Sequence, residues 1–173
     1  MDNIVKTVTA LIIGDGTPSV EISAQEADFL NSLPTSHVAS ILKDIFHSTT
    51  DLVVESRSFD ALLKLRDFDR VGFLIDLYDM SSIDWRCACC RHLVEFPDKR
   101  AVSKLASIVQ NDPDPDVRYS AAEALAESGD LAVIDALKYA KENDQGMDYE
   151  GFPIKNIAER AIQKIRDREG MVK

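Results

Sequence analysis

The fold is decided by residues 112–130, which read DPDPDVRYSAAEALAESGD. Asp114 can accept hydrogen bonds from the first amides of a helix, and Pro115 suits the first helical position. Apolar residues then recur at the spacing i, i+4, i+7 and i+8, which places them on one stripe: Val117, Ala121, Ala124 and Leu125. The pattern predicts a helix that ends at Gly129 and a second helix capped by Asp130.

The same signals recur 32 positions upstream, where residues 84–109 repeat the pattern. Two cysteines, Cys89 and Cys90, take the places of the paired alanines of the later copy. Ser82 and Asp98 are the expected helix caps of this upstream copy. A fixed period in the thirties that contains two helical patterns indicates a stack of helical repeats.

Weaker copies flank these two. A third copy, offset by 37, begins at Ile154 and follows a polar, glycine-containing loop at residues 143–151. Insertions of this kind fall in loops at the edge of a repeat stack. Upstream, residues 51–80 read as a degenerate repeat whose first helix is capped by Asp51 or by Ser58.

The first fifty residues do not follow the period. Residues 24–33 and 36–47 are expected to form helices separated by Pro34. Residues 4–13 fit a helical stripe, but their threonines and β-branched residues also suit a strand that would pair with residues 20–22. A helix is favoured, with the hairpin as the open alternative.

The chain of 173 residues is long enough for one domain with a continuous core. The predicted fold class is all-α, an α-solenoid of stacked antiparallel helix pairs preceded by a small non-repeat segment. Within the single domain, residues 1–173, we expect an N-terminal cap, a degenerate repeat, two clear repeats and a terminal half-repeat: residues 1–50, 51–80, 81–112, 113–145 and 149–173.

The chain carries 30 acidic and 20 basic side chains, a formal net charge of −10. Such a surface repels phosphate backbones and favours basic partners. No stretch approaches the length of a membrane helix, and residues 1–6 lack the basic start of a secretion signal. The three cysteines lie in one cluster, which suits a reducing compartment, so a cytoplasmic location is expected.

The cluster Cys87, Cys89, Cys90 and His92 has the composition of a metal site. On a helix, however, Cys87 and Cys90 share one face, while Cys89 and His92 lie nearly opposite, so the four side chains cannot converge on one zinc. A packing role is favoured for the cysteines and for His92, which falls on the inner stripe. No phosphate loop, nucleophile elbow or dinucleotide fingerprint occurs, so we expect no catalytic, metal or cofactor site.

Residues 112–130 resemble the short HEAT-like repeats, a class also found in phycobilisome bilin lyases and in many small bacterial proteins. The positions that carry the resemblance are Asp116, Val117, Arg118, Ala121, Ala122, Leu125, Gly129 and Asp130. The resemblance covers residues 82–165 and implies helix pairs that curve into a superhelix. It also implies that Arg86, Arg118 and Lys155, at one repeat position, pair with aspartates of neighbouring repeats. It implies no particular activity.

The function favoured is a non-enzymatic protein-binding module whose concave surface is lined by the second helix of each repeat. The candidate partner-binding residues are Asp69, Asp76, Ser103, Lys104, Ser107, Asp135, Lys138 and Glu142. Trp85 is a further candidate anchor, with core packing as its favoured role. Acidic repeats suit a basic protein partner, and a small acidic protein of this kind would serve as an immunity protein that blocks a cationic toxin.

Two alternatives stay open. The first is a bilin-lyase-like enzyme subunit or a phycobiliprotein chaperone, although no chromophore-binding motif is visible. The second is nucleic-acid binding, which needs a basic groove, whereas only residues 86–104 are basic. Function is expected where the repeats differ: in the first fifty residues, the 143–151 loop, the basic patch and the second-helix surfaces. The sequence does not indicate the oligomeric state.

Overall fold

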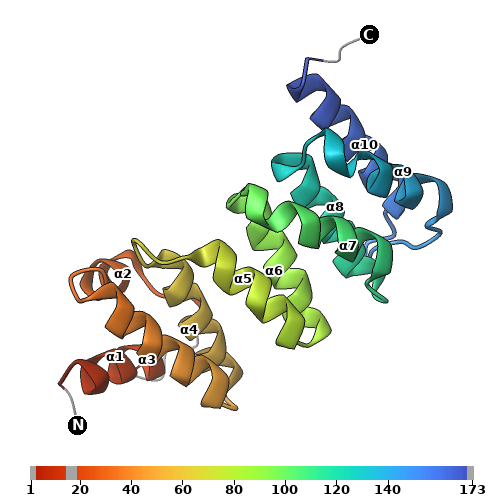
Figure 1. Cartoon of the computed structure of the whole chain (residues 1–173). Helices are drawn as coiled ribbons and strands as arrows, with labels where there is room; N and C mark the ends of the chain where they lie inside the picture. Colours follow the sequence, from red (N-terminus) through yellow and green to blue (C-terminus); the bar gives the residue numbers. More distant parts are fainter. Residues whose placement is uncertain (1–2, 15–18, 171–173) are drawn as a thin grey trace. The chain divides into compact units, whose positions relative to one another are not determined.

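The computed structural model describes residues 3–14 and 19–170, and it divides the chain into two compact units, Met1–Arg70 and Val71–Lys173. The regular structure of the described residues is helical throughout (Figure 1), so the all-α prediction is confirmed. The division falls at Arg70, inside the stretch predicted as a degenerate repeat. The assignment of residues 51–80 to one repeat therefore stays a prediction.

The first unit contains helices α1 (Asn3–Ile13), α2 (Ala24–Leu30), α3 (Thr35–Ser48) and α4 (Leu52–Lys64). α3 and α4 pack together, and α1 packs against both of them. Residues 4–13 are thus helical, as favoured, and the second strand of the alternative hairpin is not formed at residues 20–22. The core of this unit is built from large aliphatic and aromatic side chains, among them Ile12, Leu30, Leu42, Phe46, Phe59 and Leu62.

Helix caps in the first unit follow local side-chain chemistry. Asp51 accepts hydrogen bonds from the amides of Val53 and Val54, so it caps α4 as one of the two predicted candidates. The alternative prediction, that Ser58 caps this helix, is wrong. Ser58 lies fully buried within α4, where its hydroxyl donates to the Val54 carbonyl instead of accepting from a helix start.

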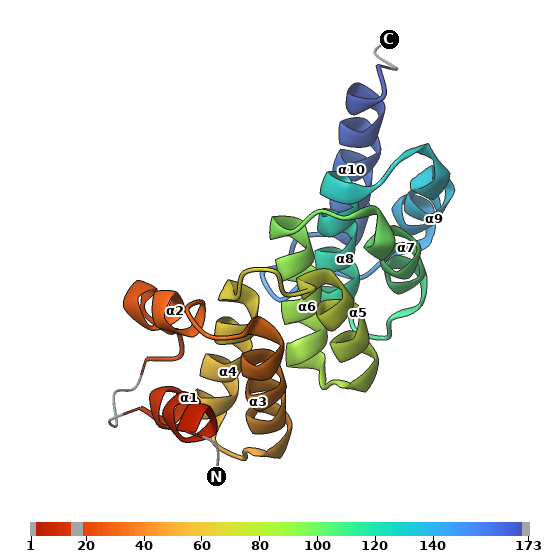
Figure 2. The ribbon, with the colours of Figure 1, turned by 60° about the vertical axis from the view of Figure 1, so that its left-hand side comes forward.

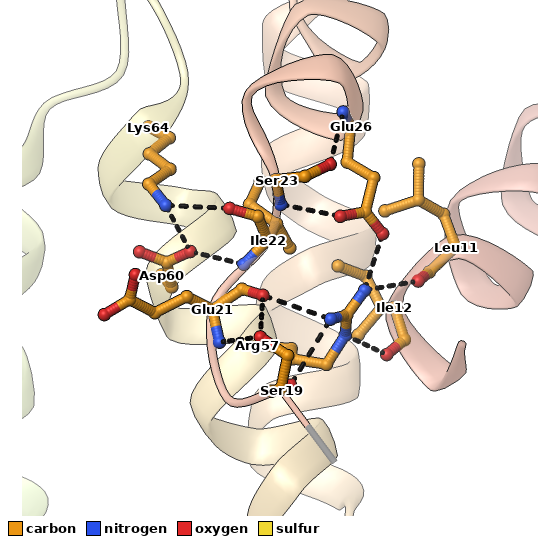
Figure 3. A network of polar contacts seen from close by, with 10 residues as sticks. All are labelled: Leu11, Ile12, Ser19, Glu21, Ile22, Ser23, Glu26, Arg57, Asp60 and Lys64. Atoms are coloured by element: carbon orange, nitrogen blue, oxygen red, sulfur yellow. Dashed lines mark hydrogen bonds and ion pairs between the residues drawn. The ribbon is translucent and has the colours of Figure 1, made fainter. Parts of the chain in front are cut away.

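A single buried arginine joins the non-repeat pieces of the first unit (Figure 3). Arg57 on α4 is 3% exposed, and its guanidinium donates to the carbonyl oxygens of Leu11 and Ile12 at 3.1 and 2.9 Å. It also donates to the carbonyls of Ser19 and Glu21, at 3.3 and 3.1 Å. These contacts satisfy acceptors at the end of α1 and hold the segment that leads into α2.

The same guanidinium contacts Glu26 on α2 at 2.6 Å. Glu26 also accepts from the Ser23 amide while Ser23 accepts from the Glu26 amide, which forms a capping box at the start of α2. Burial raises the pKa of Glu26, but the hydrogen bonds from Ser23 and Arg57 outweigh this and lower it below its ordinary value. Arg57 therefore links α1, α2 and α4 through one charged group.

The second unit contains most of α5 (Arg70–Met80), then α6 (Ile83–Glu95), α7 (Val102–Asn111), α8 (Pro115–Ser128), α9 (Ile134–Asn143) and α10 (Ile154–Arg168). Short 3-10 turns, η1 (Lys99–Ala101) and η2 (Leu131–Val133), precede α7 and α9. α8 packs against α6, α7 and α10, and α9 packs against α7 and α10. The first helices of the repeats, α6, α8 and α10, thus form one layer, and α7 and α9 belong to a second (Figure 2).

Most predicted caps of the second unit are confirmed. Asp114 accepts from the amides at the start of α8, with Pro115 at the first helical position. Asp98 and Asp130 cap the turns that precede α7 and α9. Ser82 is a correction: it occupies the position before α6, but its side chain makes no cap hydrogen bond.

Small side chains allow α6 and α8 to pack closely. Ala121 and Ala122 of α8 are fully buried, and so are Cys89 and Cys90 at the equivalent positions of α6. The packing role predicted for these two cysteines from the repeat alignment is therefore confirmed. His92 is half-buried and lies 3.3 Å from Glu95.

Candidate protein-binding groove

A hollow of about 510 Å³ lies between α6, α8 and the loop before α10, within the second unit. We call it the α6–α8 groove. Its lining residues are Ile83, Asp84, Cys87 and Arg91 of α6; Asp116, Tyr119, Ser120 and Glu123 of α8; and Asp148, Tyr149, Glu150 and Phe152 of the loop. Its volume falls in the range of roughly 300–1,000 Å³ that is typical of ligand sites.

Helical periodicity explains why these side chains meet. On α8, Asp116, Tyr119, Ser120 and Glu123 are spaced i, i+3, i+4 and i+7, so they share one face. On α6, Ile83, Cys87 and Arg91 follow at intervals of four. Because α6 and α8 pack side by side, the two faces form the walls of the groove.

The third wall comes from residues 144–153, which include all but the first residue of the 143–151 loop predicted as an insertion between repeats. Asp148 organises its turn, because its carboxylate accepts from the amides of Glu150 and Phe152 at 3.1 and 2.7 Å. Gly151 has a φ of 85°, in the left-handed region that favours glycine. The turn places Tyr149 and Phe152 at the groove, where they are 79% and 53% exposed.

The loop is tied to the helices at both ends of its turn. The Tyr149 amide donates to Asp116 on α8 at 2.6 Å, and the Ile154 amide donates to the Gly146 carbonyl at 3.1 Å. A Cβ atom at Gly146 would lie 2.7 Å from Arg118 Nη2 and 2.9 Å from Ile154 Cδ1. A side chain at this position would therefore force the Arg118 and Ile154 side chains to shift.

Arg118 anchors the start of this loop through an ion pair that also occurs one repeat earlier. It contacts Asp144 at 2.7 and 3.0 Å, and Arg86 contacts Asp112 in the same way at 3.0 and 3.3 Å. Each pair spans 26 residues. The pairing implied by the family resemblance is thus confirmed for Arg86 and Arg118, whereas Lys155 lies exposed on α10.

The repeated ion pairs shift the titration of their aspartates. Burial raises the pKa of Asp112, but hydrogen bonds from Tyr78, the Asp114 amide and Arg86 outweigh it, so the pKa lies below its ordinary value. The pKa of Asp144 is also lowered, because hydrogen bonds from Arg118 and the Gly146 amide outweigh its burial. Both carboxylates therefore stay charged at neutral pH.

The groove is acidic and partly apolar. Five carboxylates line it, those of Asp84, Asp116, Glu123, Asp148 and Glu150, against the single cation Arg91. The carboxylates of Asp116 and Asp148 accept hydrogen bonds from the loop, whereas those of Asp84 and Glu123 have no hydrogen bond or ion pair with the described residues. Exposed apolar groups lie among these charges, including Ile83 at 47%.

Cys87 is the most obvious candidate nucleophile among the groove residues. Burial, followed by the charge of Asp114, raises its pKa to about 11, so it is a neutral thiol at neutral pH. Burial likewise raises the pKa of Cys89, to about 12. Among the described residues, no group of three or more histidine, cysteine or acidic side chains could hold a metal ion.

The residues predicted from sequence to bind a partner lie elsewhere. Those on second helices are Asp76 of α5, Ser103, Lys104 and Ser107 of α7, and Asp135, Lys138 and Glu142 of α9. Lys104 is half-buried and pairs with Asp79, with its ammonium 4.8 Å from the Tyr78 ring centroid, and Lys138 pairs with Asp135 at 3.0 Å. None of these residues lines the groove.

The two other predicted partner-binding residues also lie outside the groove. Asp69 is exposed and precedes α5 in the first unit. Trp85 is half-buried on α6. A partner-binding role for either residue stays a prediction.

Sequence reasoning missed most of the groove residues themselves. It did identify the 143–151 loop as a place where the repeats differ, which includes Tyr149. It gave no reason to single out Tyr119, Glu123 or Phe152. The available signal was the alternation of acidic and aromatic residues on the outer stripe of α8 and in the loop.

Residues 72–147 match the family model of HEAT repeats, which spans α5 to the start of the groove loop. This match confirms the prediction of HEAT-like repeats over residues 72–147. Within it lie both helical walls of the groove, while Tyr149, Phe152 and α10 lie beyond it. No curated protein and no solved structure matches the chain. None of the helices in the described residues is long and apolar enough to cross a membrane.

Proposed function

We propose that this chain is a non-enzymatic protein-interaction module that binds a basic protein partner through the α6–α8 groove. HEAT repeats are in general protein-interaction modules, which supports the class of function. The observation that carries the proposal is the content of the groove: five carboxylates and one arginine surround exposed aromatic side chains.

Charge supports a basic partner. The whole chain has a formal net charge of −10, which attracts cationic proteins and speeds their association. Within the groove, the exposed rings of Tyr149 and Phe152 offer apolar area, and aromatic anchors of this kind carry much of the energy of protein interfaces. Carboxylates beside them favour partners whose contact residues are lysine or arginine.

The basic patch of residues 86–104 gives little support to nucleic-acid binding. Four of its five cations pair with aspartates: Arg86 with Asp112, Lys99 with Asp130, Arg100 with Asp98, and Lys104 with Asp79. A phosphate backbone needs cations that face solvent unpaired. The carboxylates of the groove would in addition repel it.

A catalytic role is also less well supported than binding. Cys87, the one thiol in the groove, is protonated at neutral pH because its pKa is raised. His92 contacts Glu95 and does not line the groove. The alternative of a bilin-lyase-like subunit rests on the repeat family alone, which hosts several functions.

We further propose that the partner is a cationic toxin, which the chain would block as an immunity protein. The small size and acidic charge of the chain support this, as does a groove that would cover basic contact residues of the partner. A cytoplasmic location stays a separate prediction from the sequence.

The test is cross-linked capture from the native host, followed by calorimetry with the purified partner. We expect a partner of net positive charge whose affinity falls steeply as salt rises, because screening weakens contacts between exposed charges. Suppression of the partner's toxicity on co-expression would support the immunity role. An acidic partner, or affinity insensitive to salt, would contradict the proposal of a basic partner.

A further inference from the structure

We infer that the α6–α8 groove recognises arginine in preference to lysine, on an extended segment of its partner. This inference rests on the proposed binding of a basic protein and names the side chain that the groove selects. It concerns the groove walls formed by Asp84 on α6, Glu123 on α8, and Tyr149 and Phe152 on the loop.

Aromatic rings and carboxylates lie together in the hollow. Three aromatic side chains, Tyr119, Tyr149 and Phe152, line the same space as the carboxylates. A guanidinium is flat, so its face can stack on a ring while its edge donates two parallel hydrogen bonds to a carboxylate. A lysine ammonium is a strongly hydrated point charge that gains less from such a site.

Two carboxylates of the groove are available to accept hydrogen bonds from a ligand. Asp84 and Glu123 stand on different walls, and neither is neutralised by a described residue. Asp116 is committed to the Tyr149 amide and Asp148 to the turn of the loop. A ligand therefore meets one accessible carboxylate on each helix without breaking the bonds that hold the loop in place.

Arginine side chains of this chain already lie beside tyrosine at two places. Arg160 Nη2 donates to the Tyr119 hydroxyl at 3.0 Å, at the edge of the groove. In the repeat interior, Arg86 and the Tyr78 hydroxyl both bind the Asp112 carboxylate. The combination of tyrosine, carboxylate and guanidinium is thus already stable in this fold.

The size of the hollow indicates a segment and not a lone side chain. A volume of about 510 Å³ exceeds the space that one arginine fills, so residues on either side of the arginine are also accommodated. The exposed Ile83 and Phe152 provide contact area for these neighbours. An extended segment suits the hollow, since it presents side chains singly to the two walls.

The probes for the test are two capped glycine–serine peptides that carry three central arginines or three central lysines. With the full chain at low salt, we expect the arginine peptide to bind about tenfold more tightly, the equivalent of roughly 1.4 kcal/mol. Tyr149→Ala should remove most of this preference. Tyr149→Phe should keep it, because the ring stays and only the contact of the hydroxyl with Glu150 is lost.

The acidic walls are tested by Asp84→Asn with Glu123→Gln, which should weaken the arginine peptide by about tenfold or more. A matched variant, Asp44→Asn with Glu169→Gln, removes the same charge from exposed positions that do not line the groove and should change affinity by about twofold or less. A third variant, Asp135→Asn with Glu142→Gln, tests the second-helix face. Thermal unfolding of each variant verifies that it is folded.

The outcomes separate the two proposals. Equal affinity for the arginine and lysine peptides, or loss of binding only in the α9 variant, overturns arginine recognition in the groove and leaves a basic partner possible. Absence of binding to either peptide, together with an acidic captured partner, overturns the proposed function itself. Self-association of the chain that the Tyr149→Ala variant abolishes would assign the groove to a second copy and overturn the inference.

Discussion

The two units of this chain use arginines in different ways. In residues 71–170, Arg86 and Arg118 make the same contact 32 positions apart, each with an aspartate 26 residues further on. In the first unit, Arg57 makes one contact set that nothing repeats, with partners 31 to 46 residues before it. A contact that recurs in each repeat makes its residues recur at a fixed spacing in the sequence, whereas a contact that occurs once gives no such pattern.

The comparison predicts that the first unit depends more heavily on one side chain. Arg57→Ala should cost about 3–5 kcal/mol, because it leaves Glu26 and several carbonyl acceptors at the end of α1 without their partner. Hydrogen exchange measures this region by region. We expect loss of protection in α1 and α2, with α8 and α10 unchanged.

The control for this prediction is Arg66→Ala in the same unit. Arg66 forms an exposed ion pair with Asp28 at 3.6 Å, so its loss should cost roughly 0–1 kcal/mol. Equal effects of the two substitutions would show that Arg57 does not hold the first unit together.

In the repeats, removal of one partner of an ion pair should cost less stability than Arg57→Ala, because two equivalent ion pairs stabilise the second unit. Asp112→Ala should destabilise the second unit by about 2–3 kcal/mol, because Arg86, the Tyr78 hydroxyl and the Asp114 amide all lose an acceptor. Asp144→Ala should cost less, since among the described residues the Asp144 carboxylate binds only Arg118 and the Gly146 amide. Chemical denaturation of both variants provides the measurement, and a larger loss for Asp144→Ala than for Asp112→Ala would contradict the predicted ranking.

Gly146→Ala is expected to act on both stability and the groove. The added methyl would press on Arg118 and Ile154, at a cost of roughly 1–3 kcal/mol. Because Gly146 begins the loop that carries Tyr149, affinity for the arginine peptide should also fall, although no groove residue is changed. Gly170→Ala provides a comparison of a different kind: no atom lies within 4 Å of the added carbon, so its cost would come only from the φ of 72°, in the left-handed region that favours glycine.

The smallest expected effect is on the pH dependence of stability. The pKa of Asp112 and that of Asp144 are lowered in the folded state. Their stabilisation is therefore fully present above the unfolded value of about 3.9 and is lost as pH falls through the folded pKa. The stability difference between wild type and Asp144→Asn, measured by thermal unfolding, should thus be largest near neutral pH and shrink in acid. A difference that grows in acid would show that Asp144 gains nothing from its charge.

Much of the second unit was predictable because its signals are local and repeated. The caps at Asp98, Asp114 and Asp130, the alanine positions filled by Cys89 and Cys90, and the helix pairs all follow from spacing. Ser82 failed as a side-chain cap because a position before a helix does not fix the rotamer of the side chain that occupies it.

The groove and the Arg57 network could not be read from the sequence in the same way. Both join residues far apart in the chain: Tyr149 meets Asp116 across 33 positions, and Arg57 meets Leu11 across 46. The repeat pattern predicts a binding surface on second helices such as α7 and α9. The inserted loop instead folds against first helices and forms a hollow with α6 and α8.

The most direct test of the binding surface is an NMR titration of the isotope-labelled chain with the arginine peptide. The account predicts saturable shifts in the amides of α6 and α8 around Cys87, Ser120 and Glu123, and in the 148–152 segment, with residues 19–64 unaffected. Shifts concentrated on α7 and α9, or spread evenly over acidic residues of both units, would contradict the assignment of the α6–α8 groove as the binding surface.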